Sequence, residues 1–379
     1  RVNAVILTGA YETAQMFLSW KPTLRLFAET SGKNALIITA MADRDQAIKD
    51  LAKSAFGHAG QKCSASSLAI LEAEVYDDPA FRRQLKDAVA SLHIASAHDL
   101  SAKMTTVIRQ PDPKLEKGLT TLESGEEWLL QPKMIDGNPN LWTPGIKLGV
   151  KQGSFFHQTE CFGPVLGLMR ARDLHHAIDL ANDNDYGLTG GLHTLDDREI
   201  EIWREKIQVG NAYINRGTTG AIVQRQPFGG WKKSAFGYAK AGGANYTYTL
   251  SHWQDKSEDA KTLLGRAHQS YKDAWRNHFS LEHDPSQVLG ESNVFRYRKL
   301  GRVLLRITPD SKAIDIERVL IATQYCDVPL YVSLSEESAM IDILKLDSWR
   351  HISIVVEDEA RFLNQIKSNR YQYRQRIRA

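Results

Sequence analysis

The sequence predicts an α/β protein built from two units of unequal size. Short apolar strands alternate with amphipathic helical patterns over residues 1–92, which is typical of a mostly parallel sheet. A second series of the same kind begins near residue 263, after a charged and polar stretch at 254–260. The 379 residues are 42% hydrophobic and 25% charged, which is ordinary globular usage and enough apolar material for a sizeable core.

The elements of the first unit follow from the spacing of its apolar residues. A short apolar run predicts a strand, and apolar residues that recur every three or four positions predict a helix. The predicted strands are 5–8, 35–39, 67–70 and 210–214, and the predicted helices are 12–20, 43–58, 78–92, 173–182 and 199–207. Residues 100–160 are richer in proline, glycine and polar residues, so we expect irregular strands and loops there.

The second unit is predicted as a smaller α/β domain. The predicted elements are helices at 263–279, 314–325 and 337–345 and strands at 302–307, 328–333 and 352–356. Glu357 follows the last of these strands, as a nucleotide-binding carboxylate does. However, no G-x-G-x-x-G pattern follows the strand at 302–307, which argues against a dinucleotide site in this unit.

Charge and cysteine content exclude several classes of protein. Lys and Arg number 48 and Asp and Glu 45, so the net charge of +3 gives no reason to expect a nucleic acid or an anionic membrane as partner. No apolar run approaches the 18 residues of a transmembrane helix. The three cysteines, Cys63, Cys161 and Cys326, form neither a disulfide framework nor a C-x-x-C zinc pair, so we expect no metal site and a reducing, cytoplasmic compartment.

Three residues carry side chains that suit catalysis, and each has a plainer interpretation. Cys63 follows the predicted helix 43–58 among small polar neighbours, as an accessible thiol at a turn does, although a single cysteine is often a small buried hydrophobe. A free thiol has a pKa of about 8.5, so a nucleophile there needs activation by N–H groups or a cation. Glu29 ends an apolar run before a glycine turn, and Glu160 precedes an aromatic-Gly-Pro turn; either could instead be an ordinary turn residue.

The loop at 215–230 is the fourth candidate. Gly217 and Gly220 allow its backbone N–H groups to approach a ligand closely, although the loop could equally be a flexible surface segment. Arg216 and Arg225 flank these glycines and could assist an anionic ligand or remain solvated.

Five segments, taken together and in order, resemble the aldehyde dehydrogenase superfamily. They are Leu7-Thr8-Gly9-Ala10, Ala28-Glu29-Thr30-Ser31-Gly32-Lys33, Gly60-Gln61-Lys62-Cys63, Glu160-Cys161-Phe162-Gly163-Pro164-Val165 and Pro227-Phe228-Gly229-Gly230. The stretch 213–223 and its continuation to 230 are similar, more narrowly, to the L-glutamate γ-semialdehyde (1-pyrroline-5-carboxylate) dehydrogenase part of bifunctional proline-utilisation proteins. The resemblance covers 1–254 and implies an aldehyde dehydrogenase-like catalytic domain, an incomplete Rossmann-type cofactor domain and a smaller C-terminal α/β domain.

The resemblance also implies roles for individual residues. Cys63 matches the nucleophile, and Glu29 matches the carboxylate that activates the hydrolytic water. The residues that match cofactor contacts are Thr8, Gly9, Glu160 and Phe162, and those that match substrate contacts are Gly220, Ala221 and Phe228. The implied cofactor is NAD, while FAD is expected only in a proline dehydrogenase domain that would precede Arg1 in a longer protein.

The expected organisation has four parts. They are a remnant of the NAD-binding domain at 1–30, a catalytic domain at 31–232, an oligomerisation strand region at 233–254 and a C-terminal α/β domain at 255–379. Alternation of side chains predicts a strand at 245–253 that is able to pair with another subunit. The chain reaches a predicted buried strand within four residues of Arg1, so we expect a fragment that is inactive by itself. The resemblance implies a homo-oligomeric, cytoplasmic full-length protein, with the periphery of the inner membrane as a second location.

The predicted reaction is the NAD-dependent oxidation of L-glutamate γ-semialdehyde to L-glutamate in proline catabolism, through a thiohemiacetal and a thioester on Cys63. Two alternatives stay open, namely an aldehyde dehydrogenase of another specificity and a non-catalytic assembly fragment. The two catalytic hypotheses place the same demand on the fold: Cys63 and Glu29 must converge if the chain carries this chemistry.

Overall fold

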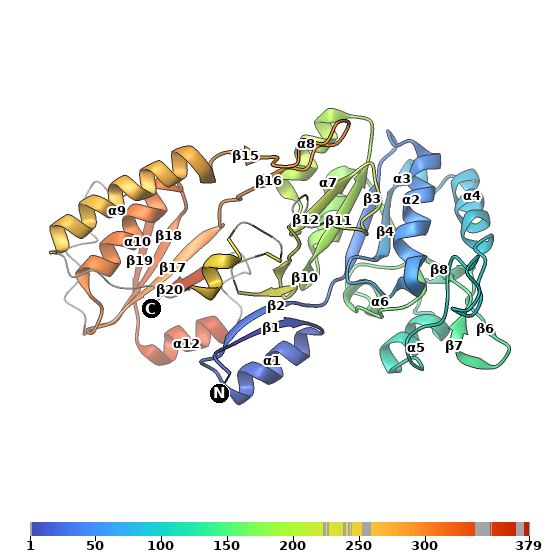
Figure 1. Cartoon of the computed structure of the whole chain (residues 1–379), viewed down its shortest axis with the longest axis horizontal. Helices are drawn as coiled ribbons and strands as arrows, with labels where there is room; N and C mark the ends of the chain where they lie inside the picture. The colour runs from blue at the N-terminus through green and yellow to red at the C-terminus, as the bar shows by residue number, and fades with distance from the viewer. Residues whose placement is uncertain are drawn as a thin grey trace. The chain divides into compact units, whose positions relative to one another are not determined.

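The chain forms two compact units, Arg1–Thr249 and Leu250–Ala379, shown in Figure 1. The computed structural model describes residues 2–222, 225, 227–237, 240, 241, 243, 245–251, 259–337, 349, 351–368 and 375–378. Each unit has parallel strands connected by helices, so the predicted α/β class is confirmed. The expected boundaries after residues 30, 232 and 254 stay predictions.

A seven-stranded mixed sheet is the centre of the first unit. Its strand order is β12-β11-β3-β4-β9-β8-β5, and only the edge pair β5 and β8 is antiparallel. The strands are β3 (Asn34–Ile38), β4 (Ser66–Glu72), β5 (Glu127–Leu130), β8 (Gly145–Leu148), β9 (Val165–Ala171), β11 (Thr189–His193) and β12 (Asn211–Ile214). All five residues of β3 are buried, as expected for a parallel strand covered on both faces.

Five helices of this unit begin directly after a capping aspartate. Aspartates at positions 43, 78, 112, 173 and 196 each accept an N–H bond from the first turn of the helix that follows. The helices are α2 (Arg44–Phe56), α3 (Ala73–Tyr76), α4 (Pro79–Ala90), α5 (Pro113–Thr120), α6 (Phe155–Gln158), α7 (Leu174–Asn182) and α8 (Asp197–Lys206). Both α2 and α7 pack on β4, which places β4 at the centre of the core.

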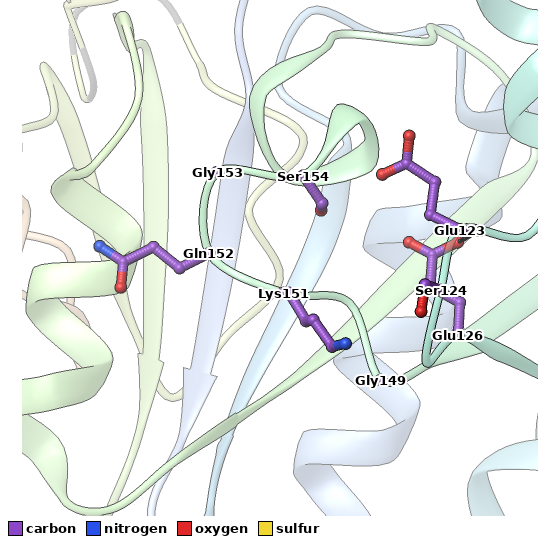
Figure 2. Close-up of a pocket in the computed structure, with 8 residues that line it drawn as sticks. All are labelled: Glu123, Ser124, Glu126, Gly149, Lys151, Gln152, Gly153 and Ser154. Atoms are coloured by element: carbon purple, nitrogen blue, oxygen red, sulfur yellow. Dashed lines mark hydrogen bonds between the residues drawn. The ribbon is translucent and has the colours of Figure 1, made fainter.

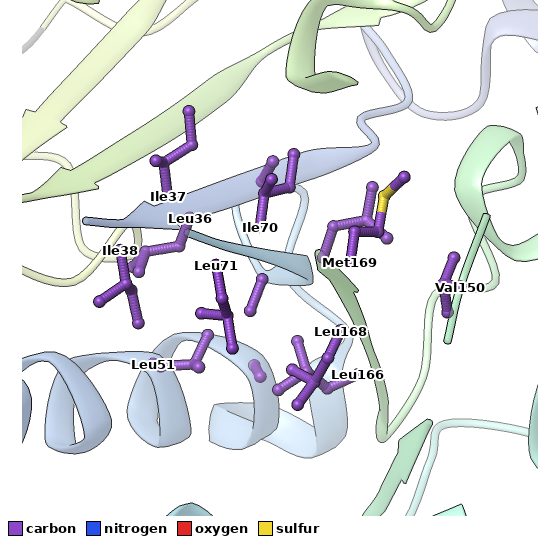
Figure 3. Packing of buried hydrophobic residues seen from close by; sticks show 14 of the residues in the cluster. Leu36, Ile37, Ile38, Leu51, Ile70, Leu71, Val150, Leu166, Leu168 and Met169 are labelled. Carbon is purple, nitrogen blue, oxygen red and sulfur yellow. The ribbon is translucent and has the colours of Figure 1, made fainter. Parts of the chain in front are cut away.

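The core between α2 and the sheet shows the alternation of a pleated strand. In Figure 3, Leu36, Ile38 and Leu71 point toward Leu51 of α2, and Ile37 points to the opposite face. Leu51 and Leu36 are completely buried. This packing holds β3 and β4 rigidly, so the loops at their ends start from well-defined positions.

A smaller three-stranded sheet lies at the start of the chain. It has the order β1-β2-β14, with β1 (Ala4–Thr8) parallel to β2 (Arg25–Glu29) through the helix α1 (Tyr11–Trp20), and β14 (Ala235–Phe236) antiparallel to β2. Two further antiparallel pairs are β6 (Met134–Ile135) with β7 (Asn138–Trp142) and β10 (Tyr186–Gly187) with β13 (Trp231–Lys232). The pairing of β14 brings a segment about 200 residues away in sequence beside Glu29.

The strand predicted at 245–253 is wrong where the structure describes it. Residues Thr247–Leu250 form a short 3-10 helix, and residues 252 and 253 lie outside the described residues. Thr249 N and its hydroxyl both donate to the Tyr246 carbonyl, at 3.2 and 2.6 Å. A lone strand satisfies none of its backbone groups, whereas a tight helical turn satisfies some of them locally, which explains the difference.

The second unit contains a four-stranded, fully parallel sheet of order β19-β18-β17-β20. The strands are β17 (Arg302–Ile307), β18 (Leu330–Leu334), β19 (Ile352–Val356) and β20 (Gln375–Arg378). The helices are α9 (Ala260–Ala274), α10 (Ala313–Tyr325) and α12 (Glu359–Lys367). A separate antiparallel pair is formed by β15 (Glu282–His283) and β16 (Phe295–Arg296). Five π-helical residues, Trp275–Phe279, continue α9. The predicted strands at 302–307 and 352–356 are confirmed at both ends, while most of the predicted helix at 337–345 lies outside the described residues.

Within the described ranges, no helix of either unit is both long enough and apolar enough to cross a membrane.

Candidate active site

The segment between β2 and β3 joins the two sheets of the first unit and organises the candidate site. Thr30 N donates to the Ser234 carbonyl at 2.9 Å, and the Thr30 hydroxyl donates to the Lys233 carbonyl at 2.6 Å. The Ser234 hydroxyl in turn donates to the Ser31 carbonyl at 2.6 Å. These buried bonds set the position of Glu29, immediately before the segment, and of Asn34 after it.

Glu29 is a half-buried carboxylate at the end of β2. Its Oε2 accepts the Gly230 N–H at 3.1 Å, and its Oε1 lies so close to Gly229 that a Cβ there would be 2.7 Å away. Burial raises the pKa of Glu29 to about 7, while the Gly230 N–H and the Lys240 ammonium oppose this rise. The carboxyl therefore titrates near neutral pH, where a general base is most effective.

The loop that carries Cys63 lies against the turn that follows Glu160. Gln61 Nε2 donates to the Phe162 carbonyl at 3.1 Å. Gly60 has a φ of +69°, and a Cβ there would lie 2.2 Å from the Gly163 carbonyl oxygen, so only glycine permits this approach. The two segments, about 100 residues apart in sequence, are thus held together by the Gln61 side chain and by close backbone contact at Gly60.

Some neighbours of Cys63 raise the pKa of its thiol and others lower it. Burial raises the pKa of Cys63, and the carboxylates of Glu160 and Glu29 also raise it. The backbone N–H groups of Ser64 and of Cys63 itself lower the pKa, without overcoming the effect of burial. The carboxylates of Glu160 and Glu29 therefore lie within electrostatic range of the Cys63 sulfur.

Glu160 is fixed by the same connecting segment. Its Oε1 accepts the Gly32 N–H at 2.8 Å, and the Ser31 hydroxyl bonds its carboxylate as well. Burial raises the pKa of Glu160, and these bonds together with the Lys33 ammonium oppose that rise. Phe162 has a φ of +55°, which is uncommon for an aromatic residue, and it is 38% exposed. Phe162 therefore combines a strained backbone with a partly exposed ring, two residues after a buried carboxylate.

Thr8 and Gly9 lie beside Glu29 across the small sheet. Thr8 pairs with Glu29 in register, and Gly9 N donates to the Glu29 carbonyl at 3.2 Å. Helix α1 begins two residues later, and its N-cap residue, Ala10, has no side-chain oxygen to cap the first turn. The Ser31 hydroxyl accepts the Tyr11 N–H of the first turn at 3.4 Å, so the start of α1 is tied to the segment between β2 and β3.

The beginning of the predicted substrate loop is anchored to the Cys63 loop. Thr218 is buried, and its N–H donates to Ser54 Oγ at 3.0 Å. Its hydroxyl donates to the Ser64 carbonyl at 2.9 Å. Gly220 and Ala221 are exposed, and Gly220 has a φ of +90°. Phe228 and Ala241 bond each other through both backbone N–H groups, at 2.8 and 2.9 Å.

Several residues that shape the site had no role in the sequence analysis. Asn34 bonds the Cys63 loop, Thr218 bonds both that loop and α2, and Lys240 lies near Glu29. Asn211 supports the loop beside Glu29, because it donates to the Pro227 carbonyl and accepts from Gly229 N. Nothing in the local sequence distinguishes these two asparagines from ordinary polar residues.

A surface hollow of about 400 Å³ lies elsewhere, between residues 123–126 and 149–154. Figure 2 shows its lining, in which Lys151 extends toward the segment that carries Glu123 and Glu126. None of the predicted site residues lines it. Glu357 of the second unit, which follows β19 as a nucleotide-binding carboxylate would, is buried. Its two carboxylate oxygens accept hydrogen bonds from the Ser333 hydroxyl and the Gln365 amide, so both are already paired within the protein.

Residues 1–254 match the family model described as the aldehyde dehydrogenase family. The chain therefore belongs to the aldehyde dehydrogenase family, and the aldehyde dehydrogenase fold expected from the sequence is confirmed.

The particular similarities are narrower. The chain is 38% identical over 237 residues to 1-pyrroline-5-carboxylate dehydrogenase of Bacillus subtilis (strain 168), which is 62% of this chain and 44% of that protein. Its fold is similar to proline utilization A (PutA) from Corynebacterium freiburgense, with a TM-score of 0.82, 44% identity, and coverage of 94% of this chain and 40% of that one. It is also similar to a Thermus 1-pyrroline-5-carboxylate dehydrogenase with bound NAD, with a TM-score of 0.60, 31% identity, and coverage of 65% and 49%. The chain thus spans less than half the length of these relatives.

Proposed function

We propose that the protein carrying this chain oxidises L-glutamate γ-semialdehyde to L-glutamate with NAD, as an aldehyde dehydrogenase of proline catabolism. The observation that carries the proposal is the Glu29 carboxyl, with a pKa of about 7, acting electrostatically on the half-buried Cys63 thiol. The similarity to proteins named 1-pyrroline-5-carboxylate dehydrogenase supports the choice of substrate.

Cys63 is the proposed nucleophile. Its thiolate attacks the aldehyde carbon, and the tetrahedral product is an S-linked alkoxide that requires fixed N–H donors. The N–H of Cys63 is one proposed donor. NAD, when bound, supplies the hydride acceptor, and the residues that we propose hold it are Thr8, Gly9, Glu160 and Phe162.

Glu29 is the proposed general base of the second half of the reaction. It removes a proton from water, the hydroxide adds to the thioester carbon, and the Cys63 thiolate leaves as the carboxylic acid forms. The proton then passes from Glu29 to solvent. Because the pKa of Glu29 is about 7, the carboxyl can both accept and release that proton near neutral pH.

Gly220, Ala221 and Phe228 are the proposed substrate contacts. The N–H groups of an exposed loop with a left-handed glycine suit the α-carboxylate of the substrate, and Phe228 suits its aliphatic chain. An aldehyde dehydrogenase of another specificity would use the same Cys63 and Glu29 and a different loop. The assembly alternative depended on the strand at 245–253, part of which is a 3-10 helix, so we do not favour it.

The organisation of the whole protein is part of the proposal. We propose NAD-domain residues at 1–30, a catalytic domain at 31–232, an oligomerisation region at 233–254 and a C-terminal α/β domain at 255–379. A flavin-containing proline dehydrogenase domain in the same full-length protein, a homo-oligomer and a cytoplasmic location are proposed as well, supported by the similarity to PutA.

The test uses the full-length protein and follows NADH formation with L-glutamate γ-semialdehyde. Cys63→Ala is expected to abolish turnover, and L-glutamate is expected to protect Cys63 from alkylation. Turnover that survives Cys63→Ala refutes the mechanism. Turnover with other aldehydes but no protection by glutamate refutes the substrate and leaves the mechanism intact.

A further inference from the structure

The carboxamide of Asn34 is buried where three backbone segments meet. Asn34 begins β3 and is 2% exposed. Its Nδ2 donates to the carbonyl oxygen of Cys63 at 2.7 Å and to that of Ala65 at 2.9 Å, and its Oδ1 accepts the Thr189 N–H at 3.0 Å. Two acceptors and one donor fit only one orientation of an amide. A single side chain therefore ties the loop of Cys63 to β3 and β11.

The direction of the Cys63 carbonyl determines what faces the sulfur. In a planar trans peptide, the carbonyl and the following N–H point in opposite directions. Asn34 holds the Cys63 carbonyl on one side, so the Ser64 N–H points to the opposite side, where it lowers the pKa of the Cys63 thiol. An N–H bond to sulfur stabilises the charged thiolate more than the neutral thiol.

The rest of the loop is held in the same way. The Ser64 carbonyl, which lies between the two carbonyls that Asn34 binds, accepts the Thr218 hydroxyl at 2.9 Å and the Thr189 hydroxyl at 3.4 Å. Both threonines are buried, with exposures of 0% and 1%. Three consecutive carbonyls are thus bound by buried side chains, so the peptide after Cys63 has little freedom to rotate.

We propose that Asn34 is a positioning residue for the nucleophile: by holding the Cys63 and Ala65 carbonyls, it keeps the Ser64 N–H directed at the Cys63 sulfur. The proposal rests on the proposed role of Cys63 as nucleophile. The Ser64 N–H lowers the pKa of Cys63, whereas burial and the carboxylates of Glu160 and Glu29 raise it. Removing the Asn34 anchor therefore frees the peptide whose N–H favours the thiolate.

The test measures the rate of Cys63 alkylation by iodoacetamide across pH in the folded full-length protein, resolved peptide by peptide with mass spectrometry. Asn34→Asp presents only acceptors to the two carbonyls, Asn34→Leu presents no polar group, and Asn34→Ser can still donate to one carbonyl. We expect the apparent pKa of Cys63 alkylation to rise by about one unit in the Asp and Leu variants, which slows alkylation about tenfold below that pKa. The Ser variant is expected to show a smaller rise.

Controls separate this effect from a loosened fold. The Ser67 hydroxyl is buried and has no hydrogen-bond partner within the described part of the chain, so Ser67→Ala is expected to leave the Cys63 profile unchanged. Asn184→Leu removes a similarly buried carboxamide that donates to the Ala181 carbonyl. This variant controls for the loss of folding stability that follows from removing any buried carboxamide. In every variant the buried Cys161 is expected to stay protected, and Cys326 of the second unit to keep its profile.

Two results overturn the proposal. One is an unchanged Cys63 profile in a folded Asp or Leu variant. The other is Cys161 becoming reactive together with Cys63, which indicates a general opening of the core. If the Asp and Leu variants do not fold, the Cys63 alkylation profile and the Cys161 protection of the Asn34→Ser variant are judged in the same way. Because alkylation needs no turnover, a shifted profile together with an active Cys63→Ala enzyme would refute the proposed function, while the effect of Asn34 on the Cys63 thiol would stand.

Discussion

The replacement Glu29→Gln should abolish activity and stabilise the fold at the same time. Gln keeps the size of the side chain and an oxygen for the Gly230 N–H, but it carries no charge at any pH. Gln cannot act as a general base, so turnover is expected to fall about 10²–10⁴-fold. One equivalent of NADH per Cys63 should still form, because the chemistry before hydrolysis does not use Glu29.

The gain in stability follows from the pKa of Glu29. Its value rises from 4.5 to about 7 on folding, so the native state binds this proton more tightly than the unfolded chain. The corresponding stability is fully present below pH 4.5 and is lost as pH rises through 7. A difference of about 2.5 units at about 1.4 kcal/mol each amounts to roughly 3 kcal/mol. Gln lacks this penalty, so its advantage over Glu should grow by about 2–3 kcal/mol between pH 5 and pH 8.

The assay is urea unfolding of the parental protein and the Glu29→Gln variant at pH 5 and pH 8, alongside NADH burst and steady-state measurements. A stability difference between these two proteins that is equal at the two pH values would show that Glu29 titrates normally. A variant that turns over at the parental rate would show that another group is the base.

Three further changes test other parts of the site. Gly60→Ala places a Cβ 2.2 Å from the Gly163 carbonyl oxygen at a φ of +69°, so we expect a loss of at least ~1–3 kcal/mol in urea unfolding, and a fully stable variant would contradict the contact. Lys240→Met removes an ammonium that lowers the pKa of Glu29, so the pH at which activity is half-maximal should move upward, and an unmoved pH–rate profile would exclude the coupling. Thr218→Val leaves the Ser64 carbonyl without its 2.9 Å donor, which should cost about 1–3 kcal/mol and raise the KM for the aldehyde, whereas an unchanged KM would separate the loop from substrate binding.

Local sequence was sufficient for most elements of the fold. The strands at 302–307 and 352–356 and the helices capped by Asp43, Asp78 and Asp173 lie where the apolar spacing predicted them. Such elements depend on neighbours within a few residues, so the pattern of side chains contains the information. The strand predicted at 245–253 failed because a strand needs a partner, and no local pattern supplies one.

For the site, the sequence alone determined which residues carry reactive groups. The types and turn positions of Cys63, Glu29 and Glu160 made them candidates only, and their roles came from the resemblance to aldehyde dehydrogenases. In the structure the carboxylates of Glu29 and Glu160 act on the Cys63 thiol. Only the tertiary structure decided their protonation and orientation: burial raises the pKa of Glu29 to about 7, and Asn34 sets the direction of the peptide after Cys63. The reason is physical. The chemical nature of a side chain belongs to the residue, whereas its solvation and hydrogen bonds depend on distant segments that meet only when the chain has folded.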